Sequence, residues 1–126
     1  RQMCIRDRFV VDDEPAVLRG TARLLERAGL VVRALASPTE VAAALAAERP
    51  ALVLTDLAMP DMSGWDVAAL VHGSMPDVPV IVMTGHMDTN DEDLATHRGV
   101  SALLPKPFTS AELEQVLRQQ LESPRR

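Results

Sequence analysis

The chain alternates short apolar runs with longer stretches of helical periodicity, and this alternation limits the folds that it can adopt. Four of the runs are almost uninterrupted, as in parallel strands that are covered on both faces of a sheet. In another run, VVRAL, Arg33 breaks the apolar sequence, so we expect that strand at an edge. The predicted strands are Phe9–Val11, Val31–Leu35, Ala51–Thr55, Val80–Thr84 and Ala102–Leu104.

The segments between these strands carry signals for helices. PAVLRGTARLLERAG has apolar residues at helical spacing, and Gly29 is placed to end that helix. Ser37 and Glu40 form a capping-box pattern at the start of a second helix, and Thr109 and Glu112 repeat it near the carboxyl terminus. Two shorter helices are predicted in GWDVAALVHG and TNDEDLATHRG. The alternation predicts an α/β fold, a three-layer doubly wound sandwich around a parallel sheet with right-handed crossovers.

Length and composition narrow the class of protein. A chain of 126 residues corresponds to one domain, 1–126, and we expect its tail, 123–126, to be frayed. No apolar run approaches the roughly 20 residues that span a bilayer, and a single cysteine is typical of a cytoplasmic protein. The net charge of −5 and the scarcity of aromatic residues argue against a nucleic-acid surface. We therefore expect a cytoplasmic protein that binds neither membrane nor nucleic acid.

Polar residues gather where the predicted strands end. Asp12 and Asp13 follow the first strand, Asp56 follows the third, Thr84 ends the fourth, and Lys106 comes shortly after the fifth. The carboxyl ends of parallel strands share one edge of a sheet, and open α/β sheets bind their ligands at that edge. We expect these side chains to converge there although they lie far apart in the sequence.

Such a set of side chains can hold a metal ion and a phosphoryl group. Three carboxylates close together repel one another unless a cation lies among them. Oxygen ligands without a nearby histidine or cysteine favour a hard divalent ion, and we expect Mg²⁺. Lys106 and Thr84 can bind phosphoryl oxygens, which leaves one aspartate free to act as a nucleophile. The histidines, His72, His86 and His97, are not spaced as metal ligands.

Four motifs, in this order, resemble the receiver (CheY-like) domain of two-component response regulators. They are VVDDEP, LVLTDLAMPDMSGWD, VIVMTGH and LLPKPF, and they extend over nearly the whole chain. The resemblance implies a five-stranded parallel sheet of order 2-1-3-4-5, the flavodoxin-like arrangement. It also implies a phosphoacceptor signalling domain of a phosphorelay, which assists only its own phosphorylation and dephosphorylation and is not an enzyme.

The resemblance assigns the acidic residues to two roles. Asp56 is expected to accept a phosphoryl group from a phosphohistidine on a sensor histidine kinase or a histidine phosphotransfer domain. Mg²⁺ is expected to be bound by Asp12, Asp13, Asp56 and the backbone carbonyl of Ala58. Phosphorylation is then expected to bias an existing equilibrium between two conformations.

The remaining motif residues are expected to shape the site. Thr84 and Lys106 are expected to bind the phosphoryl oxygens, and Pro107 to follow a cis peptide bond that turns the lysine inward. Pro60 and Gly64 are expected to shape the loop after the phosphoacceptor.

The chain departs from the receiver pattern at three positions. Leu103 stands where receivers usually carry a switching Tyr or Phe, and Gly85 stands where they often carry Ala. Ala58 has no polar side chain to position an attacking water, so we expect dephosphorylation to be slower than in an Ala58→Asn variant.

Two other classes of protein share some of these features with the receiver domain. A phosphohydrolase of the haloacid dehalogenase type also uses Asp, Lys, Thr and Mg²⁺, but requires a second Asp at the position of Ala58. A flavodoxin-like FMN binder would need a hydroxyl- and glycine-rich loop after the first strand and flanking aromatic residues, and this sequence lacks both. Within the receiver interpretation, the chain could act alone, end a hybrid sensor kinase, or precede an output domain.

The first predicted strand begins badly for a central strand, because Arg6, Asp7 and Arg8 precede its apolar residues. One explanation is that the two arginines lie at an exposed amino end of the strand. The other, which we favour, is that residues 1–8 are a non-native leader.

Overall fold

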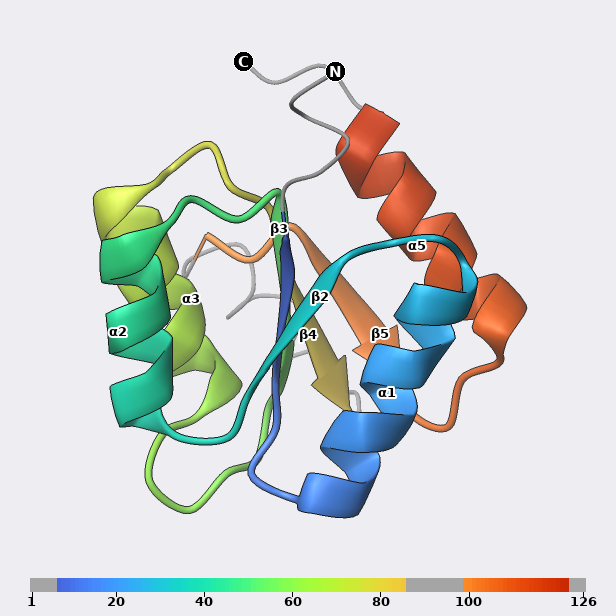
Figure 1. The fold of residues 1–126 in the computed structure, drawn as a ribbon, viewed down its shortest axis with the longest axis horizontal. Coiled ribbons are helices and arrows are strands. Elements are labelled where there is room, and N and C mark those ends of the chain that lie inside the picture. Colours follow the sequence, from blue (N-terminus) through green and yellow to red (C-terminus); the bar gives the residue numbers. More distant parts are fainter. Residues whose placement is uncertain (1–6, 86–98, 123–126) are drawn as a thin grey trace.

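The computed structural model describes residues 7–85 and 99–122, and at its centre lies a parallel β-sheet (Figure 1). The order of its five strands is β2-β1-β3-β4-β5, which confirms the predicted order and places β2, with Arg33, at an edge. Every neighbouring pair is parallel. The strands are β1 (Arg8–Val11), β2 (Val32–Leu35), β3 (Leu52–Asp56), β4 (Val80–Thr84) and β5 (Ala102–Pro105).

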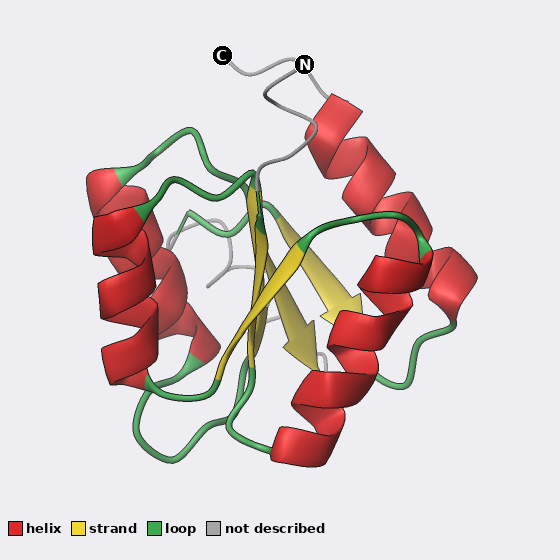
Figure 2. Cartoon of the chain, in the orientation of Figure 1, coloured by secondary structure: helices red, strands yellow, loops and turns green. Residues whose placement is uncertain are grey.

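Helices cover both faces of the sheet, as the predicted three-layer sandwich requires (Figure 2). The core on one face contains residues of α2 and α3, and the core on the other face contains residues of α1 and α5. The helices are α1 (Pro15–Arg27), α2 (Pro38–Ala47), α3 (Gly64–Ser74) and α5 (Ser110–Glu122). The helix predicted in TNDEDLATHRG lies outside the described residues except for Gly99.

The helix ends follow the local sequence closely. At Gly29 the backbone takes a φ of +89°, a conformation that favours glycine and ends α1 as predicted. Thr109 and Glu112 exchange two hydrogen bonds, of 2.9 and 3.1 Å, and so form the predicted capping box of α5. At α2, Ser37 accepts from the amide of Glu40, but the glutamate carboxylate accepts from the amide before the cap instead of from the cap itself.

The amino end of β1 corrects one expectation. Arg8 is the first residue of β1 and is only 7% exposed, so the explanation that it lies at an exposed strand end is wrong. The reason is the central position of β1, because Val32 of β2 and Leu52 of β3 lie beside Arg8 in the two neighbouring strands. Arg6 lies outside the described residues, and the non-native origin of residues 1–8 stays a prediction.

Candidate functional site

The carboxyl ends of β1, β3 and β4 bring the predicted polar residues to one edge of the sheet. Asp12 directly follows β1, Asp56 is the last residue of β3, and Thr84 is the last residue of β4. All three are buried, whereas Asp13 is exposed. Asp12, Asp13 and Asp56 each present a carboxylate oxygen, and these oxygens lie within 4.8 Å of one another. The expected acidic cluster is therefore present at the expected edge.

Asp12 is the most deeply buried member of this cluster, at 2% exposure. Its Oδ1 accepts a hydrogen bond of 3.0 Å from the amide of Glu14, but its Oδ2 is buried without a hydrogen-bond partner among the described residues. Burial raises the pKa of the Asp12 carboxyl above its ordinary value, and the negative charge of Asp56 raises it further. A divalent cation would both satisfy the free oxygen and offset this desolvation, so the cluster fits a hard metal ion.

Lys106 reaches the cluster from the segment that follows β5. Its Nζ lies 2.5 Å from Oδ1 of Asp56, and its amide donates a hydrogen bond of 2.7 Å to the carbonyl of Thr84. The Lys106–Pro107 peptide bond is cis, in agreement with the resemblance. The positively charged Lys106 side chain thus contacts the Asp56 carboxylate directly. From this position it can also pair with negative charge that is added to Asp56.

The backbone at the end of β3 lies close to Gly64, the first residue of α3. A Cβ atom at Gly64 would lie 2.7 Å from the carbonyl oxygen of Asp56, so no side chain can be accommodated at this position without a shift. The amide of Gly64 also donates a hydrogen bond of 2.8 Å to the carbonyl of Leu57. Pro60 and Ala58 are exposed in the loop that joins β3 to α3. Gly64 therefore lies close against the backbone of the acidic residue.

Sequence reasoning did not identify two features of this region. Thr55, fully buried in β3, donates a hydrogen bond of 2.9 Å from its hydroxyl to the carbonyl of Asp56. The only signal in the sequence was a threonine in an otherwise aliphatic run, LVLTD. Ser63 and Asp66 also form a full capping box at the start of α3, and a serine three residues before an aspartate could have indicated it.

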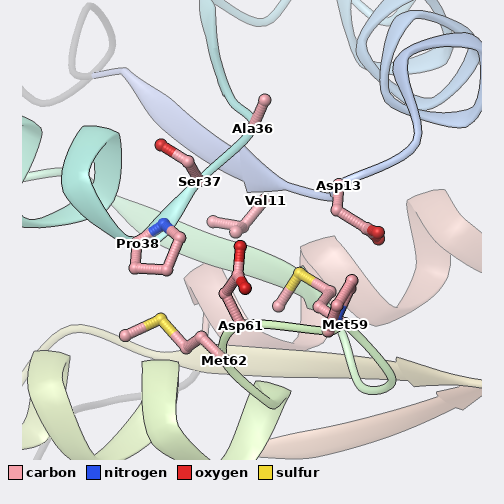
Figure 3. Close-up of a pocket in the computed structure, with 9 residues that line it drawn as sticks. Val11, Asp13, Ala36, Ser37, Pro38, Met59, Asp61 and Met62 are labelled. Atoms are coloured by element: carbon pink, nitrogen blue, oxygen red, sulfur yellow. The ribbon is translucent and has the colours of Figure 1, made fainter.

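A small pocket adjoins the cluster on the side of β2 (Figure 3). Asp13 lies at one side of it, and the carboxylate of Asp61 points from the loop after β3 toward Val11. Its volume of about 20 Å³ accommodates a water-sized molecule but not a phosphodonor. We therefore place phosphoryl transfer at Asp56 and Lys106, which do not line this pocket.

A CheY-like sheet with carboxylates and a lysine at its carboxyl edge defines a phosphoacceptor signalling domain. The family described as the response regulator receiver domain matches residues 9–118, and the chain belongs to this family. The chain is accordingly a signalling phosphoacceptor and not an enzyme, which excludes the phosphohydrolase alternative. The family also implies an interaction with a histidine kinase.

The relatives share the domain at moderate identity. The DNA-binding transcriptional regulator NtrC of Proteus hauseri is 36% identical over 100 residues, which is 79% of this chain and 21% of that protein. The C4-dicarboxylate transport transcriptional regulatory protein DctD of Rhizobium meliloti is 33% identical over 117 residues, or 93% of this chain and 25% of that protein. The chain thus spans about a quarter of the length of these curated relatives.

Solved receiver domains have the same fold. The receiver domain protein (CheY-like) of Methanospirillum hungatei superposes with a TM-score of 0.86 at 27% identity and covers 94% of both chains. A receiver domain of Clostridium thermocellum gives a TM-score of 0.84 at 30% identity, covering 92% of this chain and 94% of that one.

The histidines and the membrane expectation concern residues outside the site. His72 is exposed on α3, whereas His86 and His97 lie outside the described residues. Among the helices that the structure describes, none has the length and apolar character needed to cross a membrane.

Proposed function

We propose that Asp56 accepts a phosphoryl group from a phosphohistidine on a sensor histidine kinase or a histidine phosphotransfer domain. The observation that carries this proposal is the contact of Lys106 with Asp56, beside the carboxylates of Asp12 and Asp13. This contact distinguishes Asp56 from Asp12 and Asp13. Among the described residues, Asp56 is the member of the cluster that has a positively charged side chain within ion-pair distance. The full protein would then be a receiver that acts alone, a regulator with an output domain, or a hybrid sensor kinase that uses the same site.

Mg²⁺ is the metal that we assign to the cluster. Asp12, Asp13 and Asp56 would hold it together with the backbone carbonyl of Ala58, and the partnerless Oδ2 of Asp12 supports this assignment. When bound, the ion would neutralise negative charge on the phosphoryl oxygens as the transfer proceeds.

The chain's own residues perform the rest of the transfer. A carboxylate oxygen of Asp56 attacks phosphorus as the bond from phosphorus to the histidine nitrogen breaks. The nitrogen keeps the electron pair and takes a proton from solvent. Lys106 would exchange its contact with the Asp56 carboxylate for one with a phosphoryl oxygen, and we expect Thr84, buried at the end of β4, to donate a second hydrogen bond from its hydroxyl.

Switching would follow from the change in charge at this edge. The new phosphoryl group would contact Lys106, directly after β5, and Thr84, the last residue of β4, which are joined by a backbone hydrogen bond of 2.7 Å. Leu103 of β5 is partly buried and packs against the core beneath α2 and α3. We therefore propose that the signal leaves through a shift of the segment after β5, without rotation of an aromatic side chain.

The decisive experiment is phosphorylation of the purified chain by acetyl phosphate and Mg²⁺. We expect a base-labile mass increase of one phosphoryl group in the wild type and none in Asp56→Asn. Asp61→Asn is the matched control, since Asp61 is an exposed carboxylate five residues further along the same loop. Phosphorylation of Asp56→Asn at the wild-type rate, or repeated turnover of a phosphomonoester, would refute the proposal.

A further inference from the structure

The peptide group between Asp56 and Leu57 is held at both of its ends. Its N–H, from Leu57, donates a hydrogen bond of 2.9 Å to the carbonyl of Met83 in β4. Its C=O, from Asp56, accepts the hydroxyl of Thr55 at 2.9 Å. This is the peptide at which β3 ends and the loop begins, and it sets the direction in which the chain leaves the sheet.

The side chain of Thr55 makes this hydrogen bond inside the protein. Thr55 has no exposed surface, and the carbonyl that it contacts also lies against the backbone of Gly64. A buried carbonyl that loses its donor retains its desolvation penalty, and the peptide then tends to rotate toward another donor. Gly64 leaves little space on its side for such a movement.

The burial of Thr55 does not itself require a hydroxyl group. The preceding residues of β3 are aliphatic, and valine has the same shape and an equal preference for strands. The hydroxyl therefore adds a function that packing alone would not select. That function concerns the direction of the backbone on both sides of the Asp56–Leu57 peptide.

We propose that Thr55 is a positioning residue for cation binding at the acidic cluster. By holding the Asp56 carbonyl, its hydroxyl fixes the peptide plane that joins the Asp56 carboxylate to Ala58, whose carbonyl is the fourth ligand assigned above. Groups that orient a metal's ligands typically change metal affinity by about 10- to 100-fold when they are removed. The inference rests on the proposed function only in taking Asp12, Asp13 and Asp56 as the cation site.

The test compares Thr55→Val, which removes the hydroxyl and keeps the shape, with Thr55→Ser, which keeps the hydroxyl and removes the methyl group. Mg²⁺ affinity is measured by titration calorimetry on the unphosphorylated chain. Amide hydrogen exchange at Leu57 is measured without Mg²⁺. We expect about tenfold weaker Mg²⁺ binding and faster Leu57 exchange in Thr55→Val. Thr55→Ser should keep both wild-type values, as should the control Thr21→Val, a buried threonine of α1.

Either of two results would overturn the inference. The first is wild-type Mg²⁺ affinity and Leu57 exchange in Thr55→Val, and the second is an equal loss in Thr55→Ser, which would assign the effect to packing. If Thr55→Val does not fold, Thr55→Ala takes its place, because it also lacks the hydroxyl. A wild-type chain that binds Mg²⁺ but is not phosphorylated at Asp56 would refute the proposed function and leave this inference standing.

Discussion

Strand β1 has a buried charged residue at each end, and the two have different surroundings. Arg8 at the amino end is 7% exposed, and Asp12 just after the carboxyl end is 2% exposed. Asp12 meets two further carboxylates, Asp13 and Asp56, in a cluster that one cation can complete. Arg8 instead lies between aliphatic strand starts, beside Val32 and Leu52.

The difference shows which buried charges a parallel sheet can use. The loops that carry ligand-binding residues follow the carboxyl ends of the strands, so a charge at that end is joined by residues from several strands. A charge at the amino end also loses water, but no ligand-binding loops converge on it. We infer that the burial of Asp12 serves cation binding, whereas Arg8 has a structural role at the amino end of the strand.

The largest effect is expected from removing the buried charge at the carboxyl end. Asp12→Asn should weaken Mg²⁺ binding by more than about 100-fold, because it removes a direct ligand and not only a group that orients one. In Mg²⁺-free buffer the same variant should be more stable than the wild type, because a desolvated carboxylate is lost. Calorimetric titration and thermal melts measure the two quantities. Asp77→Asn, an exposed carboxylate paired with Arg49 at 3.7 Å, is the control, and unchanged Mg²⁺ affinity in Asp12→Asn would contradict the assignment.

Replacing the buried charge at the amino end should have the opposite consequence. Arg8→Leu is expected to lower the free energy of unfolding by about 1 to 3 kcal/mol, because it removes one member of a contact that Arg8 makes inside the protein. Mg²⁺ affinity should not change. Arg33→Leu is the matched control, because Arg33 is exposed on the edge strand and its contact with Glu48, 3.4 Å long, contributes little. A higher melting temperature in Arg8→Leu would show that burying the arginine costs more stability than its contact contributes.

The pH dependence of stability tests the buried carboxyl at the carboxyl end of β1. Because the pKa of Asp12 is raised in the folded protein, protonation of this carboxyl favours the folded state. Its contribution to stability is full below the unfolded pKa of about 3.8 and is lost as the pH rises through the higher folded pKa. In Mg²⁺-free buffer, the free energy of unfolding of the wild type, relative to that of Asp12→Asn, should therefore fall as the pH rises from about 3.8 through the folded pKa. Denaturant titrations at several pH values measure the difference, and a rise instead of a fall would contradict the direction of the shift.

The smallest effect concerns the exposed loop at the carboxyl end. Ala58→Asn should speed dephosphorylation about two- to tenfold, the equivalent of one hydrogen bond to an attacking water. Decay of the phosphorylated chain after removal of acetyl phosphate measures the rate. Pro60→Ala, a change in the same loop that adds no polar group, serves as the control. Equal decay of the wild type and Ala58→Asn would refute the expectation.

Much of the fold could be predicted because it depends on local patterns. The apolar runs located the strands to within a residue at most ends, and Arg33 in VVRAL identified the edge strand. The capping box of Thr109 and Glu112 formed as its spacing indicated, because both partners lie within one turn of the same helix. Placing Asp12, Asp56 and Lys106 at one edge required only the rule that parallel strands share a direction.

Other features could not be predicted because they depend on residues that are remote in the sequence. An exposed strand end was one of two explanations for Arg8, but neighbouring strands on both sides bury it. The hydroxyl of Thr55 cannot be told from that of any strand threonine until the end of β3 places the Asp56 carbonyl beside it. Gly64 was expected to shape the loop, yet the group that it must accommodate, the Asp56 carbonyl, became evident only in three dimensions.

The sequence by itself determined the order of strands and helices and the chemical types that could meet at the carboxyl edge. It did so because periodicity and capping act over a few residues. Only the tertiary structure decided which of these groups are buried and which atoms lack a partner, above all Oδ2 of Asp12. Burial depends on what neighbouring strands and helices cover, and the contact of Lys106 with Asp56 joins residues 50 positions apart. Such distances are set by the packing of the whole sheet and not by any segment of it.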